Sequence, residues 1–188
     1  QKTWPDEIRK WDHLKHLKIS RVLGSEKQRL AALQVKADIW VINRENVEWL
    51  VDLYGKEWPF DMVVIDELSS FKSSKAKRFR ALRKVRPCIK RIVGLTGTPA
   101  PNGLIDLWPQ VYLLDQGERL GKTVTGYRNR YFEPGKRNRT VIFSWDPKPG
   151  AEEAIYSKLE DLCVSMSAED WLQMPERIDR EVMVQIPE

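Results

Sequence analysis

"MVVIDELSSFKSS" (residues 62–74) joins four apolar residues to two adjacent carboxylates, Asp66 and Glu67, just ahead of a basic segment. A short, continuous apolar run of this kind predicts a buried strand. In parallel α/β sheets, ligands gather at the carboxyl ends of the strands. The two carboxylates are therefore expected where a substrate would lie.

Apolar runs of similar length recur on both sides of this stretch and alternate with helical patterns. Ser25 and Gln28 form a capping-box pair, and Gly55 is expected to end a helix that Asn43 or Asn46 begins. Strands separated by helices indicate βαβ units around a mostly parallel sheet, and hence an α/β fold. The predicted strands are residues 18–23, 38–42, 61–65 and 91–95, and the predicted helices are residues 3–11, 25–33, 47–54 and 74–85.

The C-terminal half of the sequence is less regular. A helix is predicted over residues 104–114, with Pro109 near its first turn. Residues 116–150 are rich in Gly, Arg, Pro and aromatic residues, which indicates an irregular basic insertion with a hairpin strand at residues 140–145. A last helix over residues 151–163 and a strand-like run at residues 181–186 complete the predicted elements.

Length and composition limit the class of protein. A chain of 188 residues with 41% hydrophobic content can bury one core. Its apolar runs are far shorter than a membrane span, and the N-terminus lacks a signal pattern, so we expect a soluble cytoplasmic protein with no membrane partner. Cys88 and Cys163 lack metal-site spacing and are expected to be reduced thiols. The chain begins with Gln1 rather than Met, which suggests a fragment.

Charge is distributed unevenly, although the formal net charge is only +5. Between Leu68 and Ile105 there is no acidic residue. A polyanion is one expected partner of this segment, and a solvated helix face balanced by acids elsewhere is the alternative. The basic residues of the segment are Lys72, Lys75, Lys77, Arg78, Arg80, Arg83, Lys84, Arg86, Lys90 and Arg91.

An apolar strand that ends in Asp-Glu is also the Walker B pattern. One carboxylate of such a pair holds Mg²⁺, and the other orients or deprotonates the water that attacks the γ-phosphate. The alternative is that both carboxylates cap the following helix. The sequence VGLTGTPAPNGLIDLW (residues 93–108) favours the first interpretation, because Thr96 and Thr98 place hydroxyls at the end of the next strand, within a glycine-rich turn.

Together these two stretches resemble a known family. VVIDELSSFKSSKAKRFRAL (residues 63–82) and LTGTPAPNGLIDLW (95–108) are similar to motifs II and III of the Swi/Snf branch of superfamily-two helicase-like ATPases, and phage-type members are the most similar. TWPDEIRKW (3–11) resembles the helix after motif Ia, and IWVINRENVEWL (39–50) resembles motif Ib. The segment from Met166 to Glu188 resembles the exit from the first lobe.

The resemblance implies a parallel-sheet, RecA-like lobe of the P-loop NTPase type that is incomplete. Residues 1–115 would form part of the first lobe, residues 116–150 the basic and aromatic insertion, and residues 151–188 the end of the lobe and the exit toward a second lobe. The implied cofactors are ATP and Mg²⁺. The implied partner is DNA, which in this family is double-stranded, and the implied source is bacterial or phage-encoded.

The resemblance also implies roles for single residues. Asp66 would hold Mg²⁺ through water, and Glu67 would be the catalytic base. Thr96, Gly97 and Thr98 would couple the nucleotide state to DNA contact. The residues expected to bind nucleic acid are Lys72, Lys75, Lys77 and Arg78. The sequence departs from the family at Ser69, where many members have His.

A phosphate-binding loop of the form G-x-x-x-x-G-K-[ST] is missing from the sequence. GERLGKT (residues 117–123) fails the pattern by one residue, since Gln116 stands where the first Gly would be, and no strand precedes it. By analogy with the family, the true loop would lie upstream and a second lobe downstream. The fragment alone is then expected to bind ATP weakly and to be inactive, and its strand at residues 91–95 would have an open edge that could mediate self-association.

Two other function classes stay open. A non-catalytic nucleic-acid-binding module fits the basic segment. A metal-dependent nuclease could use Asp66 and Glu67, but no Glu here has Lys two positions later. A basic and aromatic patch around residues 127–139 fits nucleic-acid contact and a structural insertion equally. His13 and His16 are expected at the surface, and core packing is expected for Trp4, Trp11, Trp40 and Trp49.

Overall fold

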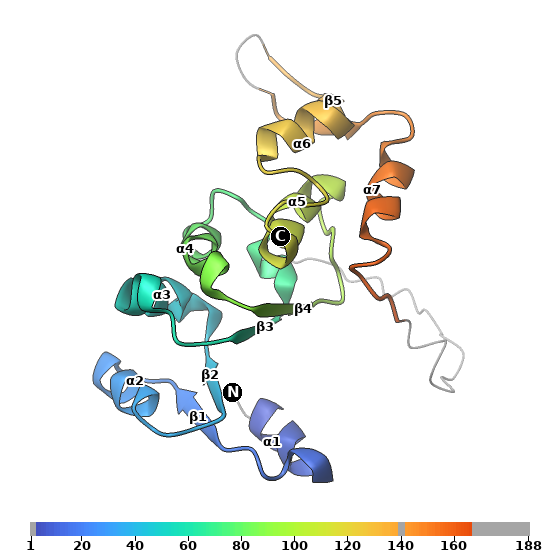
Figure 1. Ribbon diagram of the computed structural model, residues 1–188. Coiled ribbons are helices and arrows are strands. Elements are labelled where there is room, and N and C mark those ends of the chain that lie inside the picture. The colour runs from blue at the N-terminus through green and yellow to red at the C-terminus, as the bar shows by residue number, and fades with distance from the viewer. Residues whose placement is uncertain (1–2, 139–141, 167–188) are drawn as a thin grey trace, which may run out of the picture.

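A computed structural model describes residues 3–138 and 142–166, and Figure 1 shows the arrangement of their helices and strands. β1 and β2 pair in parallel, with Ile19 opposite Ile39 and Val22 opposite Ile42. The helix α2 connects them, so the predicted βαβ unit is present. The N-terminal elements are α1 (Thr3–Lys10), β1 (Ile19–Val22), α2 (Glu26–Leu33) and β2 (Ile39–Ile42).

The capping box at the start of α2 is confirmed. The Ser25 hydroxyl accepts a hydrogen bond from the Gln28 backbone N–H at 3.4 Å, and the Gln28 side chain accepts one from the Ser25 N–H at 2.8 Å. Two N–H groups that an unprotected helix start would leave without partners are thus satisfied.

A second βαβ unit carries the two carboxylates. β3 and β4 pair in parallel over their whole length, from Met62 opposite Arg91 to Asp66 opposite Leu95. Within the described residues, this pair and the β1–β2 pair are two separate two-stranded sheets rather than the single sheet that we expected. The elements of this part are α3 (Val47–Tyr54), β3 (Met62–Asp66), α4 (Lys77–Val85) and β4 (Arg91–Leu95).

The predicted helix boundaries in this unit hold in part. Gly55 ends α3 as expected, with a positive φ of 50°, but Asn46 at its start makes no side-chain capping hydrogen bond. The basic helix is shorter than predicted, since α4 begins at Lys77 and Ala76 before it has extended backbone angles. Lys72 and Lys75 therefore precede the helix, in a turn after the 3-10 segment η4 (Leu68–Phe71).

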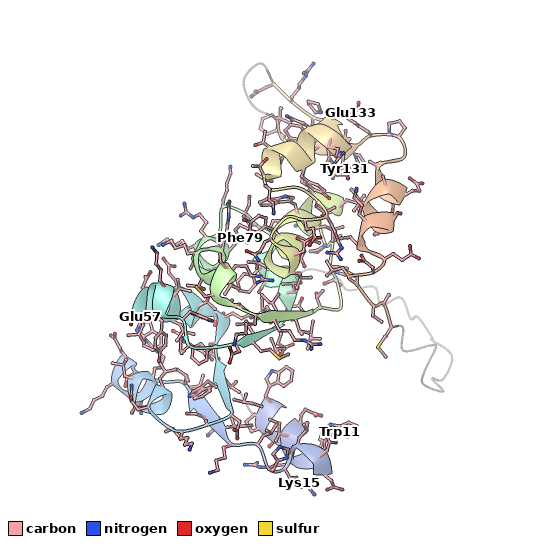
Figure 2. The ribbon with its side chains drawn as sticks, viewed as in Figure 1. Trp11, Lys15, Glu57, Phe79, Tyr131 and Glu133 are labelled. Atoms are coloured by element: carbon pink, nitrogen blue, oxygen red, sulfur yellow. The ribbon has the colours of Figure 1, made fainter. Side chains whose placement is uncertain are left out.

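The core lies between α4, α5 (Leu107–Asp115) and one face of the β3–β4 pair. Phe79 of α4, labelled in Figure 2, is fully buried, and its ring centroid lies 6.0 Å from that of Trp108 in α5. Ile65 from β3 joins the same cluster. The predicted helix 104–114 is divided, because its first residues form the 3-10 segment η6 (Leu104–Asp106). Pro109 then falls in the first turn of α5, where a missing N–H does no harm.

The insertion is more regular than predicted. It contains a helix that the sequence did not predict, α6 (Val124–Tyr131), followed by the antiparallel pair β5 (Phe132–Pro134) and β6 (Trp145–Pro147). The predicted strand at residues 140–145 is wrong in its bounds, since Ile142 makes only an isolated bridge with Arg137. α7 (Ala151–Leu159) ends before the predicted Cys163. The strand-like run at residues 181–186 lies outside the described residues.

Core packing of the tryptophans is only partly observed. Trp4, Trp40 and Trp49 are half-buried, but Trp11 is 55% exposed. The expectation for Trp11, labelled in Figure 2, is wrong because α1 ends at Lys10 and Trp11 lies outside the helix.

Among the described residues, neither outer edge of the β3–β4 pair has a partner strand, and one face of the pair is open to solvent. β3 and β4 pair only with each other, so the outer edge of β4 is unpaired. Met62, Val64 and Leu95 on the uncovered face are 49%, 46% and 42% exposed. Self-association through this edge stays a prediction. No helix in the described part of the chain is long and apolar enough to cross a membrane.

Candidate functional site

The carboxyl ends of β3 and β4 form one edge, and the predicted site residues meet there. Asp66 is the last residue of β3 and pairs with Leu95, the last residue of β4. Glu67 follows with φ 64° and ψ 68°, a left-handed conformation that is uncommon for a residue other than Gly. The chain therefore turns sharply at Glu67 and brings its carboxylate toward the end of β4.

Two hydroxyls hold the Glu67 carboxylate. The Ser69 Oγ donates a hydrogen bond to Glu67 Oε1, and the Thr96 Oγ1 donates another to the same oxygen at 2.6 Å. These hydrogen bonds, first from Ser69 and then from Thr96, lower the pKa of Glu67, so this carboxylate is ionised at neutral pH. Among the described residues none donates to Oε2, which leaves that oxygen available to a water.

The backbone at Glu67 is also fixed. Its carbonyl oxygen accepts hydrogen bonds from the Ser70 N–H at 3.1 Å and from Arg44 Nη1 at 3.4 Å. Arg44 lies in the 3-10 segment η2 (Arg44–Asn46), just after the end of β2, and its positive charge also lowers the pKa of Glu67. Sequence reasoning missed Arg44, although its position after a predicted strand end was a usable signal.

Gly94 permits the close approach of the 3-10 segment after Glu67 to β4. A Cβ atom at this position would lie 2.4 Å from Leu68 Cδ2, a distance that side chains do not reach. Gly94 pairs with Ile65, directly before the carboxylates. We conclude that Gly94 leaves room for the Leu68 side chain against β4, rather than serving a turn.

The loop after β4 is tied to α5. Within the loop, the Thr96 hydroxyl accepts a hydrogen bond from the Thr98 N–H at 3.3 Å. Gln110 of α5 donates to the Pro99 carbonyl at 2.6 Å, and Asp106 accepts from the Asn102 N–H at 3.1 Å. Thr96 and Thr98 are thus linked to each other, and the loop reaches from the Glu67 carboxylate to a buried helix. Gly97 faces open space, because a Cβ atom added to it would have no described atom within 4 Å.

Asp66 fits a magnesium site that is completed by other ligands. Its side chain is exposed at the strand end, and the described residues contain no group of three or more His, Cys, Asp or Glu side chains that could hold a metal alone. Mg²⁺ is commonly bound by one or two protein carboxylates, with waters and substrate phosphates as its other ligands. A single exposed carboxylate next to Glu67 meets that requirement.

Some basic side chains of this segment contact other parts of the chain, and others make no ion pair. The described residues offer no ion-pair partner to Lys72, Lys75, Lys77 or Arg78. Lys75 and Lys77 are exposed, whereas Lys72 and Arg78 are half-buried. In contrast, three cations of the same segment make internal contacts. Arg83 lies over the Tyr112 ring at 4.8 Å, Lys90 pairs with Asp61 at 2.6 Å, and Arg86 is buried.

The GERLGKT loop (residues 117–123) does not have the setting of a phosphate-binding loop. It follows the helix α5 rather than a strand, and the Asp115 carboxylate accepts hydrogen bonds from the Gly117 and Arg119 N–H groups at 2.8 and 2.9 Å. Lys122 donates to the Gln116 carbonyl at 3.0 Å. The first amides of the loop and Lys122 therefore make hydrogen bonds within the chain, at the end of a helix.

Comparison with known proteins gives consistent similarities. The profile described as "SNF2-related domain" matches residues 1–187. Protein p41 of Acyrthosiphon pisum secondary endosymbiont phage 1 is 40% identical over 193 residues, which cover 100% of this chain and 42% of the phage protein. The bovine "DNA excision repair protein ERCC-6-like" is 30% identical over 167 residues, covering 85% of this chain and 13% of that protein.

Among solved structures, the "Sulfolobus solfataricus SWI2/SNF2 ATPase core in complex with dsDNA" is similar with a TM-score of 0.64 and 22% identity. The match covers 89% of this chain and 31% of the other. At that identity the likeness shows the fold, which is that of a RecA-like ATPase core. The chain thus spans less than half the length of each of these relatives.

Proposed function

The chain belongs to the SNF2-related domain family, and on that basis we propose that it is part of a DNA-dependent ATPase of the helicase-like translocase type. In this proposal the edge formed by Asp66, Glu67 and Thr96 is half of the ATP site. The observation that carries the proposal is the 2.6 Å hydrogen bond between the Thr96 hydroxyl and the Glu67 carboxylate, which joins the two sequence motifs at one strand edge.

The chemistry follows from the positions of the two acids. Asp66 would hold Mg²⁺, which neutralises charge on the β- and γ-phosphates when it is bound. Glu67, ionised and fixed through Oε1, would present Oε2 to the attacking water and orient or deprotonate it. Because Ser69 and Thr96 hold the carboxylate in one orientation, little reorganisation would be needed when the water arrives.

The loop from Thr96 to Gly103 would couple this site to the rest of the lobe. A change in the hydrogen bond between Thr96 and Glu67 on hydrolysis would reach α5 through Gln110 and Asp106, which hold the far part of the loop. Gly97 and Thr98 lie between these two contacts, at the exposed part of the loop. This arrangement supports the role of Thr96, Gly97 and Thr98 as a link between nucleotide state and DNA contact.

The phosphate-binding loop would be supplied by another part of the same protein. The printed sequence contains no G-x-x-x-x-G-K pattern, and the phage relative is longer than this chain, which covers 42% of it. We therefore expect the chain alone to bind ATP weakly, since most phosphate contacts in such sites come from that loop and its lysine.

Isothermal titration calorimetry and a hydrolysis assay test the proposal together. The full-length protein that carries this chain should hydrolyse ATP with Mg²⁺, and double-stranded DNA should increase the rate. The isolated 188-residue chain should show no micromolar ATP affinity and no hydrolysis. DNA binding by the full-length protein without any ATP hydrolysis would instead support a binding module, and Mg²⁺-dependent DNA cleavage would support a nuclease.

The free cations after β3 are proposed to contact DNA phosphates. Changing Lys75, Lys77 and Arg78 together to Glu should weaken DNA binding by the full-length protein to a similar extent for all sequences, because phosphate contacts carry no sequence information. The slope of log affinity against log salt concentration should fall by about one unit for each phosphate that is no longer neutralised. Fluorescence anisotropy at several salt concentrations measures both quantities.

A matched control reverses the charge of three exposed lysines that lie outside the basic segment. Changing Lys27, Lys36 and Lys158 to Glu alters the net charge equally, but these residues lie in α2, the loop after it and α7. The control should lose much less affinity. Equal losses in both triple variants would mean that only total charge matters, and would assign the basic segment to a solvated surface.

A further inference from the structure

The β5–β6 hairpin is held firmly at its base. Tyr127, Tyr131 and Phe132 are buried, and Tyr127 donates a hydrogen bond to the Leu104 carbonyl at 2.7 Å. Trp145 of β6 packs against the same core. The aromatic residues that the sequence left open as a nucleic-acid patch are thus structural, and Figure 2 shows Tyr131 at this base.

The hairpin continues past this base into solvent. The Gly135 N–H donates to the Ser144 carbonyl at 3.0 Å, and the Phe143 N–H donates to the Lys136 carbonyl at 2.7 Å. Arg137 and Ile142 form a further antiparallel bridge. Backbone hydrogen bonds therefore fix these residues, although no core side chains support them.

Apolar and basic side chains share this outer part of the hairpin. Phe143 is 67% exposed and Ile142 is 39% exposed. Lys136 faces Phe143 across the two strands, and Arg137 faces Ile142, so each face carries one cation and one exposed apolar group. Neither cation has an ion-pair partner in the described part of the chain. We call Lys136, Arg137, Ile142 and Phe143 the hairpin end.

A nucleic-acid strand with unpaired bases has the matching chemistry. Aromatic side chains stack on unpaired bases regardless of sequence, and nearby cations contact the backbone. The depletion of lysine at protein interfaces counts against a protein partner, although phenylalanine and arginine are enriched there. The acids of the hairpin, Glu133 and Asp146, lie opposite each other at its base (Glu133 is labelled in Figure 2), and within the described residues neither forms an ion pair with Lys136 or Arg137.

We propose that the hairpin end binds single-stranded nucleic acid, with Phe143 stacked on an unpaired base while Lys136 and Arg137 contact phosphates beside it. The site is separate from the basic segment after β3 and independent of ATP hydrolysis, since neither Asp66 nor Glu67 takes part. It would give the protein a preference for DNA that contains an unpaired region.

Anisotropy measurements with a fluorescein-labelled single-stranded oligothymidine test this proposal on the chain itself, with a duplex of equal length as the second probe. Phe143→Ala should weaken single-strand binding roughly ten-fold and leave duplex binding unchanged. Phe143→Trp should keep the affinity, and Phe143→Leu should lose it, because leucine has no ring to stack. Tyr156→Ala, which removes a 51% exposed aromatic side chain from α7, is the control and should have no effect.

The contribution of Lys136 and Arg137 is measured separately, through the salt dependence of binding. Changing Lys136 and Arg137 together to Gln should reduce the salt slope for the single strand by about 0.7 for each phosphate that the variant no longer neutralises. Full affinity in Phe143→Leu would mean that ring stacking does not hold the single strand, and would overturn the proposal. It would also be overturned if Phe143→Ala had no effect, if it weakened duplex binding equally, or if the unaltered chain failed to bind the single strand.

Discussion

Glu67→Gln in the full-length protein should lower the rate of DNA-stimulated ATP hydrolysis by about 10²- to 10⁴-fold while ATP binding persists. Glutamine keeps the shape of the side chain and can still accept hydrogen bonds from Ser69 and Thr96, which now hold Glu67 Oε1. It cannot take a proton from the attacking water, and it has no negative charge to orient that water.

Asp66→Asn should have a different effect. The exposed Asp66 side chain is proposed to anchor Mg²⁺, so the loss of its charge should weaken Mg²⁺-dependent nucleotide binding as well as the rate. Single-turnover hydrolysis and a separate nucleotide-binding assay distinguish the two variants. Glu57→Gln, which neutralises an exposed carboxylate in the 3-10 segment η3 (Gly55–Glu57), is the control and should be close to wild type.

Retained ATP hydrolysis in Glu67→Gln would contradict the proposed roles of the two carboxylates. If Glu67→Gln hydrolyses ATP within a few-fold of the parent rate, Asp66 and Glu67 are not a Walker B pair. The carboxylates would then serve the local structure, through the hydrogen bonds that Glu67 makes with Ser69 and Thr96.

Much of the fold could be predicted because local sequence and tertiary structure agree in the first half of the chain. The four strands up to residue 95 form close to their predicted positions. Three of them are short, mainly apolar runs, and β1 has β-branched residues at both ends. The Ser25 capping box was readable from two residues three positions apart. The meeting of Glu67 and Thr96 followed from one rule, that parallel strands place their carboxyl ends at the same edge.

The parts that sequence reasoning missed depend on contacts between distant segments. α6 contains Gly126 and β-branched residues, so its intrinsic preference for helix is weak, and burial of Tyr127 and Tyr131 stabilises it. The Arg44 contact with the Glu67 carbonyl joins positions far apart in the chain. Ser69 was noted only as a departure from the family, because its hydrogen bond to Glu67 requires the left-handed turn that the structure shows.

Arg86 shows most directly why a run of basic residues cannot be read as one surface. It belongs to the segment expected to meet a polyanion, yet only 7% of its surface is exposed. Its guanidinium donates hydrogen bonds to the carbonyls of Leu113 and of Leu114 (2.6 Å) in the last turn of α5, and to that of Ile89 at 2.9 Å. These helix-end carbonyls lack intrahelical partners, and the partial negative charge of the helix end favours a cation there.

Arg86→Met should therefore lower the free energy of unfolding of the chain by about 3–5 kcal/mol, because it leaves several buried carbonyls without donors. Arg86→Lys should recover only part of this loss, since a single ammonium cannot reproduce the planar set of donors that contacts three carbonyls. Arg80→Met, on the exposed side of α4, should change the free energy of unfolding by less than about 0.5 kcal/mol.

Urea denaturation followed by circular dichroism measures the free energy of unfolding of all three variants. A change of less than about 1 kcal/mol for Arg86→Met would mean that water replaces the guanidinium at the end of α5, and that Arg86 contributes charge rather than structure.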